Sequence, residues 1–163
     1  MSKDVIMGNG QYDEHVRRML IFQEVKDGKQ LETVNDIKRF DKIISDNKEF
    51  INEPVGEKNE TALHEAIVTR NIPKAHRLLA HGAEVDVQDA LGRTPLFWAA
   101  YQANPILILL LLNMNASLHF QDSNGRDCFD ILGVYKRTTE RKLTVCRWIL
   151  AKYKIKSQEK KET

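Results

Sequence analysis

The sequence repeats a short motif at a fixed distance, and this period constrains the fold more than any other feature. Residues 92–101 read Gly-Arg-Thr-Pro-Leu-Phe-Trp-Ala-Ala-Tyr. A related motif begins at Thr61, 33 positions before Thr94, and a weaker one begins at Asp127, 33 positions after Thr94. A period of this length indicates supersecondary units that stack on one another, because a single unit cannot bury its own apolar face.

Composition places the chain among soluble globular proteins. Its 163 residues are 42% hydrophobic and 29% charged, which suits one ordinary domain with its own core. The net charge of +2 is too small to argue for nucleic acid or an anionic membrane. The longest apolar run, residues 106–112, is far shorter than the roughly 20 residues that span a bilayer. We therefore expect no membrane association and a cytoplasmic protein, in the host cytosol if a pathogen delivers it.

The chain divides into segments of different pattern. Residues 1–11 lack periodicity and are expected to form a flexible arm. Residues 12–55 carry two apolar runs at three- and four-residue spacing, separated by Asp27-Gly28, and this pattern predicts an N-terminal helical hairpin. Repeat units are then expected over 56–88, 89–121 and 122–153, followed by a charged tail over 154–163.

Start and stop signals in the clear units predict two helices in each. Thr61 is placed to cap the first helix of one unit, and Asn104-Pro105 provides a cap and a first-turn proline for the second helix of the next. Gly82 and Asn115 are suited to the left-handed conformation that ends a helix.

Three motifs resemble the ankyrin repeat. They are Gly-x-Thr-Pro-Leu-x-x-Ala-Ala at 92–100, Thr-Ala-Leu-His-x-Ala at 61–66 and Leu-Leu-x-x-Gly-Ala-x-Val-Asp at 78–86. The resemblance implies an all-α fold, a solenoid of stacked helix-turn-helix units with short hairpin turns. It implies about three repeats, with the N-terminal hairpin as a degenerate capping repeat and 122–153 as the C-terminal capping repeat.

The departures from the family pattern gather in the last repeat. His64 fills the family's histidine position, where it is expected to bond the backbone, whereas Phe97 and Asp130 replace it in the next two repeats. Cys128 stands at the proline position of the last repeat, which suits a cap. An insertion delays the second helix of that repeat, which we expect over 143–152.

The sequence offers no convincing catalytic or metal-binding constellation. The two cysteines, Cys128 and Cys146, lie in apolar surroundings and are expected to be buried thiols, with a disulfide as the alternative. No phosphate loop or paired carboxylates occur. We predict a protein that is not an enzyme and has no cofactor, metal or small-molecule substrate. The five histidines lack metal-ligand spacing; they are His15, His64, His76, His81 and His119.

The resemblance implies a protein-binding module, an adaptor or inhibitor that holds another protein on its concave face of turns and first helices. By the family's pattern, the contact positions lie around each turn and after the paired alanines. They are Glu57, Lys58, Glu60, Leu91, Arg93, Tyr101, Gln102, Asn124, Arg126 and Tyr135, with Val68, Thr69, Ala90, Ser123 and Val134 as further positions. Trp98 is expected to pack in the core.

An apolar set at outward positions of the second helices does not follow the family pattern. It consists of Ile106, Leu109, Leu110 and Trp148, and it predicts a convex patch for a second contact or a homodimer. The alternative is that the N-terminal arm or the C-terminal Tyr153 and Ile155 fold back over it, or that the alignment of the helices slips by one residue. A structural, self-associating role is therefore the second functional hypothesis. Nucleic-acid binding by the lysine-rich tail is disfavoured, because acidic residues interleave there.

Overall fold

The computed structural model describes residues 14–27, 29–134 and 138–159, and over these residues the regular structure is helical apart from one isolated bridge between Val55 and Glu60. The chain forms two compact units, one up to Ala83 and one from Glu84 onwards. The segment expected to be a flexible arm and Tyr135 lie outside the described residues. The all-α class predicted from the repeat is confirmed.

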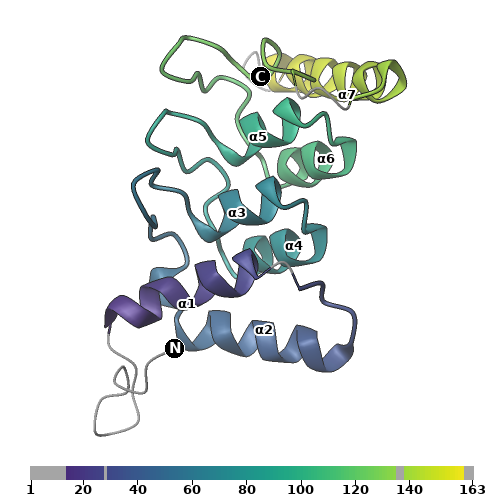
Figure 1. Ribbon diagram of the computed structural model, residues 1–163. Coiled ribbons are helices and arrows are strands. Elements are labelled where there is room, and N and C mark those ends of the chain that lie inside the picture. The colour runs from purple at the N-terminus through teal and green to yellow at the C-terminus, as the bar shows by residue number, and fades with distance from the viewer. Residues whose placement is uncertain (1–13, 28, 135–137, 160–163) are drawn as a thin grey trace, which may run out of the picture. The chain divides into compact units, whose positions relative to one another are not determined.

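The described residues of the first unit form four α-helices and one short 3-10 turn. Helices α1 (Glu14–Lys26) and α2 (Val34–Asp46) form in the segment expected to be a hairpin, and η2 (Lys48–Phe50) follows them. Helices α3 (Ala62–Val68) and α4 (Ile72–Ala80) form the first clear repeat. As Figure 1 shows, α3 packs against both α1 and α4.

The expected caps begin the helices of this repeat. The Thr61 hydroxyl accepts the His64 backbone N–H, and the His64 Nδ1 accepts the Thr61 backbone N–H at 3.2 Å. His64 therefore has the structural role predicted for it. Asn71 caps α4 by accepting the Lys74 backbone N–H, and Pro73 occupies the first turn. A proline is tolerated there because no intrahelical bond needs its missing N–H.

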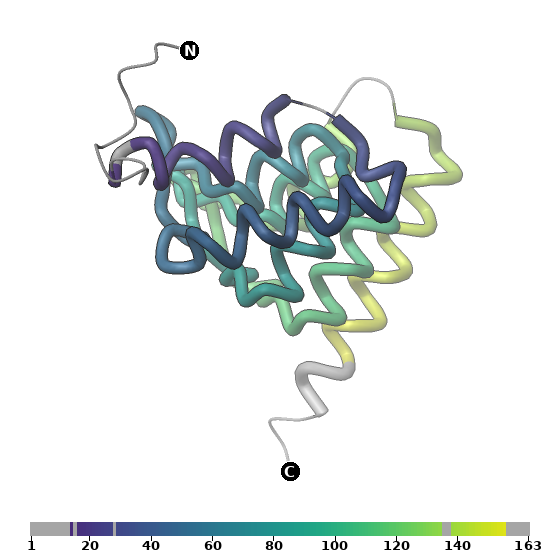
Figure 2. The backbone as a smooth tube through the Cα atoms, turned by 90° about the horizontal axis from the view of Figure 1, so that it is seen from below, coloured from purple at the N-terminus to yellow at the C-terminus, as the bar shows by residue number. Residues whose placement is uncertain are grey.

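The second unit contains α5 (Pro95–Tyr101), α6 (Pro105–Asn113) and α7 (Glu140–Glu159). Helix α6 packs against α5 and α7, and Figure 2 shows α7 running alongside α6. Asn115 ends α6 with a φ of 63°, as the sequence predicts. The core between these helices is apolar and fully buried; it includes Leu96, Ala99, Ala100, Leu107, Ile108, Leu111, Cys146 and Leu150.

The last repeat departs from a regular helix pair. Residues 128–133 form turns where the first helix of a repeat is expected. Asp127 accepts the backbone N–H of Phe129 and Asp130, and Gly133 then adopts a φ of 73°, so the chain leaves the helical conformation after one turn. Helix α7 is longer than the predicted 143–152 and continues into the expected tail, because no glycine or proline interrupts it.

Candidate partner-binding site

A buried carboxylate fixes the turn that precedes α5. The Asp89 Oδ1 accepts the backbone N–H groups of Leu91 and Arg93, both at 2.9 Å, and its Oδ2 accepts Arg93 Nε at 2.7 Å. Gly92 closes the turn in the left-handed region, with a φ of 76°. The Arg93 guanidinium is consequently held in place by its own turn.

The next turn repeats this geometry one repeat later. Asp122 accepts the backbone N–H groups of Asn124 and Arg126 at 2.9 Å, and its Oδ2 accepts Arg126 Nη2 at 2.7 Å. The hydrogen bond from the Arg126 guanidinium lowers the pKa of Asp122 to about 2. The Ser123 backbone N–H donates to the Leu91 carbonyl at 2.9 Å, which ties the two turns together.

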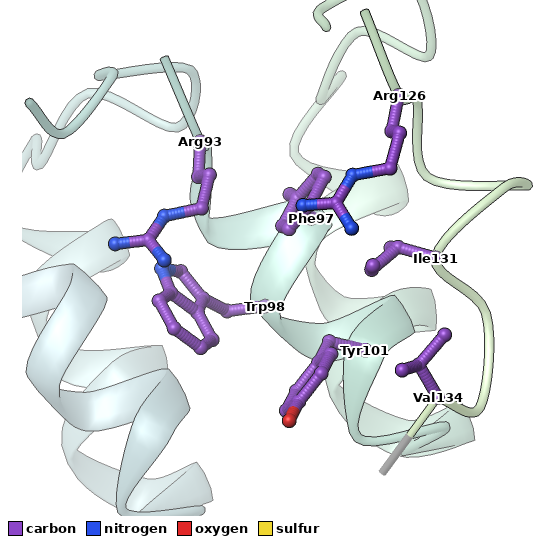
Figure 3. A pocket seen from close by; sticks show the side chains of 7 residues that line it. All are labelled: Arg93, Phe97, Trp98, Tyr101, Arg126, Ile131 and Val134. Carbon is purple, nitrogen blue, oxygen red and sulfur yellow. The ribbon is translucent and has the colours of Figure 1, made fainter. Parts of the chain in front are cut away.

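A pocket of about 180 Å³ lies between these two arginines (Figure 3). The Arg93 Cζ lies 4.3 Å from the centroid of the Trp98 ring, and the Trp98 Nε1 donates to Asp89 Oδ2 at 3.4 Å. The Trp98 and Tyr101 rings meet edge to face, with centroids 5.7 Å apart. The lining residues are Arg93, Phe97, Trp98, Tyr101, Arg126, Ile131 and Val134.

The described residues that line this pocket are mostly aromatic and aliphatic, with a guanidinium on each side. None of these described residues carries a carboxylate, thiol or imidazole. Each guanidinium is paired with a buried aspartate, so the charges next to the pocket balance. Such a site can bury an apolar side chain of a partner while the arginines and Tyr101 contact polar groups around it.

The structure brings part of the predicted contact set together. Leu91 and Asn124 are exposed in the two turns, Arg126 is exposed beside the pocket, and Tyr101 is half-buried in its lining. Arg93 also lines the pocket, but only 17% of its side chain is exposed, because it is bound to Asp89 and stacked on Trp98.

Other predicted contact residues lie elsewhere. Gln102 was expected to face outward, and that expectation is wrong, since its side chain is buried at the C-cap of α5. Glu57 and Lys58 are exposed and Glu60 is half-buried in the turn before α3, in the first unit. Nothing is described for Tyr135.

Sequence reasoning missed the aromatic part of the site. Trp98 was assigned to the core, yet it is half-buried and forms part of the pocket lining. Phe97 and Ile131 also line the pocket, although both are mostly buried. The available signal was the replacement of the family's histidine by Phe97, which leaves an apolar rather than a polar side chain at that position of α5.

The residues of the predicted convex patch lie on α6 and α7. Ile106 is 59% exposed, Leu109 41% and Trp148 62%, while Leu110 is half-buried. The Tyr153 hydroxyl donates to the Asn113 side chain. Neither residue covers Trp148 or Leu109 enough to bury it, and a binding role for the patch stays a prediction.

The cysteines and possible metal ligands of the described residues do not form a further reactive site. Cys128 and Cys146 are free and buried. Burial raises the pKa of the Cys128 thiol to about 12 and that of Cys146 to about 11, which disfavours the nucleophilic thiolate. Within residues 14–27, 29–134 and 138–159, no group of histidine, cysteine and carboxylate side chains could hold a metal ion. In the same ranges no helix is both long and apolar enough to cross a bilayer.

Known proteins share the repeat region of this chain. It is 48% identical to a palmitoyltransferase AKR1 of Naumovozyma castellii over 42 residues, which are 26% of this chain and 6% of that protein. It is 34% identical over 93 residues to the ankyrin repeat, SAM and basic leucine zipper domain-containing protein 1 of Atelerix albiventris, covering 57% of this chain and 19% of that protein. It is 30% identical over 121 residues to the mouse ankyrin repeat and SAM domain-containing protein 6, covering 74% of this chain and 13% of that protein. The chain thus spans less than a fifth of each relative's length.

A family model described as ankyrin repeats in three copies matches residues 21–122, which is more than half of the chain. This match includes both clear repeats and much of the N-terminal segment, and it ends where the last, irregular repeat begins. The capped helices and the two aspartate-fixed turns described above lie within or at the edge of this range. The chain belongs to the ankyrin-repeat family.

Proposed function

We propose that this chain is a non-catalytic adaptor or inhibitor that binds a protein partner on the surface around the pocket of the second unit, and that it acts in the cytoplasm. Ankyrin repeats are generally protein–protein interaction modules and are generally non-catalytic. The relatives' own activities do not carry over, because they are matched over short parts of their length. The observation that carries the proposal is the pocket between Arg93 and Arg126.

Rigidity supports this surface as a binding site. The two turns are each fixed by a buried aspartate, and Trp98 is fixed by contacts to Arg93, Asp89 and Tyr101. A surface that is already ordered loses little conformational entropy when a partner binds. Tyrosine, tryptophan and arginine are also the residue types that contribute most to interface energies.

The partner class follows from the same geometry. The open pocket has room for one apolar side chain, and the exposed Val134 adds an apolar side chain to its lining. We therefore expect a partner segment with one anchoring aromatic or aliphatic residue. In the first unit, Glu57, Lys58 and Glu60 remain proposed contacts of their own turn.

A peptide-display selection against the intact protein tests the proposal. Selected peptides should share an aromatic or aliphatic anchor and should bind Tyr101→Ala and Val134→Glu at least about tenfold more weakly than wild type. Val34→Glu is the matched control, since Val34 lies on α2 and is 66% exposed, whereas Val134 is 54% exposed. If the peptides bind Val134→Glu as well as Val34→Glu, the partner does not bind at the pocket.

A further inference from the structure

The outward face of α7 carries a row of exposed apolar side chains. Val145, Trp148 and Ile155 are all exposed, whereas Cys146 and Leu150 of the same helix are buried. None of the three lines the pocket. Neighbouring exposed apolar side chains on a folded surface often mark an interaction site, so this row is a candidate contact surface.

The same face of α7 also carries exposed cations. Arg141, Arg147 and Lys152 are exposed, and no acidic residue occurs between positions 141 and 155. None of the ion pairs found in the described part of the chain includes these three cations. Six other arginines do have a carboxylate partner; they are Arg17, Arg18, Arg39, Arg77, Arg93 and Arg126.

We propose that the α7 outer face, defined as Arg141, Val145, Arg147, Trp148, Lys152 and Ile155, binds an acidic amphipathic segment of a partner protein. Carboxylates of the segment pair with the cations while its apolar residues cover the exposed row. Complementary charge across an interface favours such a partner and disfavours others. This second contact is independent of the pocket.

The charges of this face and their arrangement favour an acidic segment over two other occupants, a second copy of the chain and a membrane surface. A symmetric second copy would bring Arg147 and Lys152 close to the same cations of its partner, and like charges repel. A membrane surface favours a helix whose cations lie apart from a continuous apolar face. On α7 the cations and the apolar side chains are interleaved instead, since the Lys152 Nζ lies 4.9 Å from the centroid of the Trp148 ring.

The test uses the full chain and a labelled synthetic helix of about 18 residues that alternates leucine pairs with glutamates, long enough to form a helix. Fluorescence anisotropy measures its affinity, together with that of a matched peptide carrying lysine in place of glutamate. We expect Arg147→Glu/Lys152→Glu to bind the acidic peptide at least about tenfold more weakly and to gain affinity for the lysine peptide. Trp148→Ala should also bind the acidic peptide about tenfold more weakly, while its circular dichroism spectrum stays unchanged.

The matched control is Lys38→Glu/Lys42→Glu, which makes the same charge change at two exposed positions of α2 and should bind the acidic peptide as wild type does. The proposal is overturned if the acidic peptide does not bind, or if both double variants weaken it equally. Binding to phosphatidylserine vesicles in place of the peptide would assign the face to a membrane. A concentration-dependent dimer that Trp148→Ala abolishes would assign it to a second copy.

Discussion

Two buried aspartates organise the turns of the second unit. Asp89 and Asp122 each accept two backbone N–H groups and the guanidinium four residues later. A carboxylate with this many donors is stabilised in its charged form, and its removal leaves the turn's N–H groups without acceptors. These residues hold the pocket arginines although they do not line the pocket themselves.

The Asp122→Asn substitution tests this role and its pH dependence. The pKa of Asp122 is lowered to about 2 from 3.8, so its ionised form stabilises the fold above about pH 4, and this contribution is lost as the pH falls through about 2. We expect the substitution to lower the free energy of unfolding by roughly 1–3 kcal/mol at neutral pH. Urea denaturation should show this difference shrinking between about pH 4 and pH 2. A difference that does not change with pH would contradict the assignment.

Gly92 and Gly125 occupy equivalent turn positions and provide a matched pair. Both have a positive φ, 76° and 73°, but a Cβ at Gly92 would lie 3.1 Å from the Gln121 carbonyl oxygen, whereas nothing lies within 4 Å at Gly125. Alanine in the left-handed region costs roughly 1 kcal/mol. Thermal denaturation should therefore show a larger decrease in melting temperature for Gly92→Ala than for Gly125→Ala. Equal losses would mean that the close approach to Gln121 has no energetic effect.

At the residue scale the sequence predicts backbone roles better than surface roles. The left-handed helix ends at Gly82 and Asn115 follow from residue type and are confirmed. The exposure of Arg93 and Gln102 does not follow, because it depends on contacts within the turn and at the end of α5. The family pattern predicts which backbone position a residue occupies. The contacts of its side chain with neighbouring residues determine whether that side chain is exposed.

At the scale of elements, caps decide where the short helices begin. Helix α5 has only seven residues, and its N-cap Thr94 accepts the Phe97 backbone N–H while Pro95 fixes the first turn. A helix this short is unstable alone and depends on its cap and its packing. Because α5 carries Phe97, Trp98 and Tyr101, the same cap also positions much of the pocket.

Thr94→Ala should lower the free energy of unfolding by about 1 kcal/mol, since the side-chain cap is lost. Thr94→Ser keeps the hydroxyl and should lose much less. Thr144→Ala serves as a matched control within α7, where the hydroxyl of the exposed Thr144 donates to the Glu140 carbonyl and caps no helix N-terminus. Chemical denaturation followed by circular dichroism compares the three variants. If Thr94→Ala were no more costly than Thr144→Ala, the capping assignment would be wrong.

Element prediction is least successful where one local interaction competes with another. Residues 128–132 carry helix-compatible side chains, yet Asp127 and Gly133, which flank them, make residues 128–133 a series of turns. Lys74 is a second case, because a lysine in an outer helix is expected in solvent. It is fully buried, and its Nζ donates to the Glu24 carbonyl and lies near the Phe40 ring. Such a contact between distant segments leaves no signal in the local pattern.

At the scale of the whole molecule, the 33-residue period is sufficient to assign the all-α ankyrin-repeat class, and the family match confirms it. The period fixes which positions build the core of each unit. It leaves undetermined the side chains between them, which form the pocket and the α7 outer face. Both proposed surfaces therefore depend on side chains that the period does not determine.

Hydrogen–deuterium exchange of the intact protein, with and without a display-selected peptide, tests whether the pocket binds a partner. We expect slower exchange in α5 and in the turns at 89–93 and 122–126, with no change in α2. The Tyr101→Ala variant should lose this protection at the same peptide concentration. Protection confined to α2, or protection around the pocket that survives in Tyr101→Ala, would contradict a partner-binding role for the pocket.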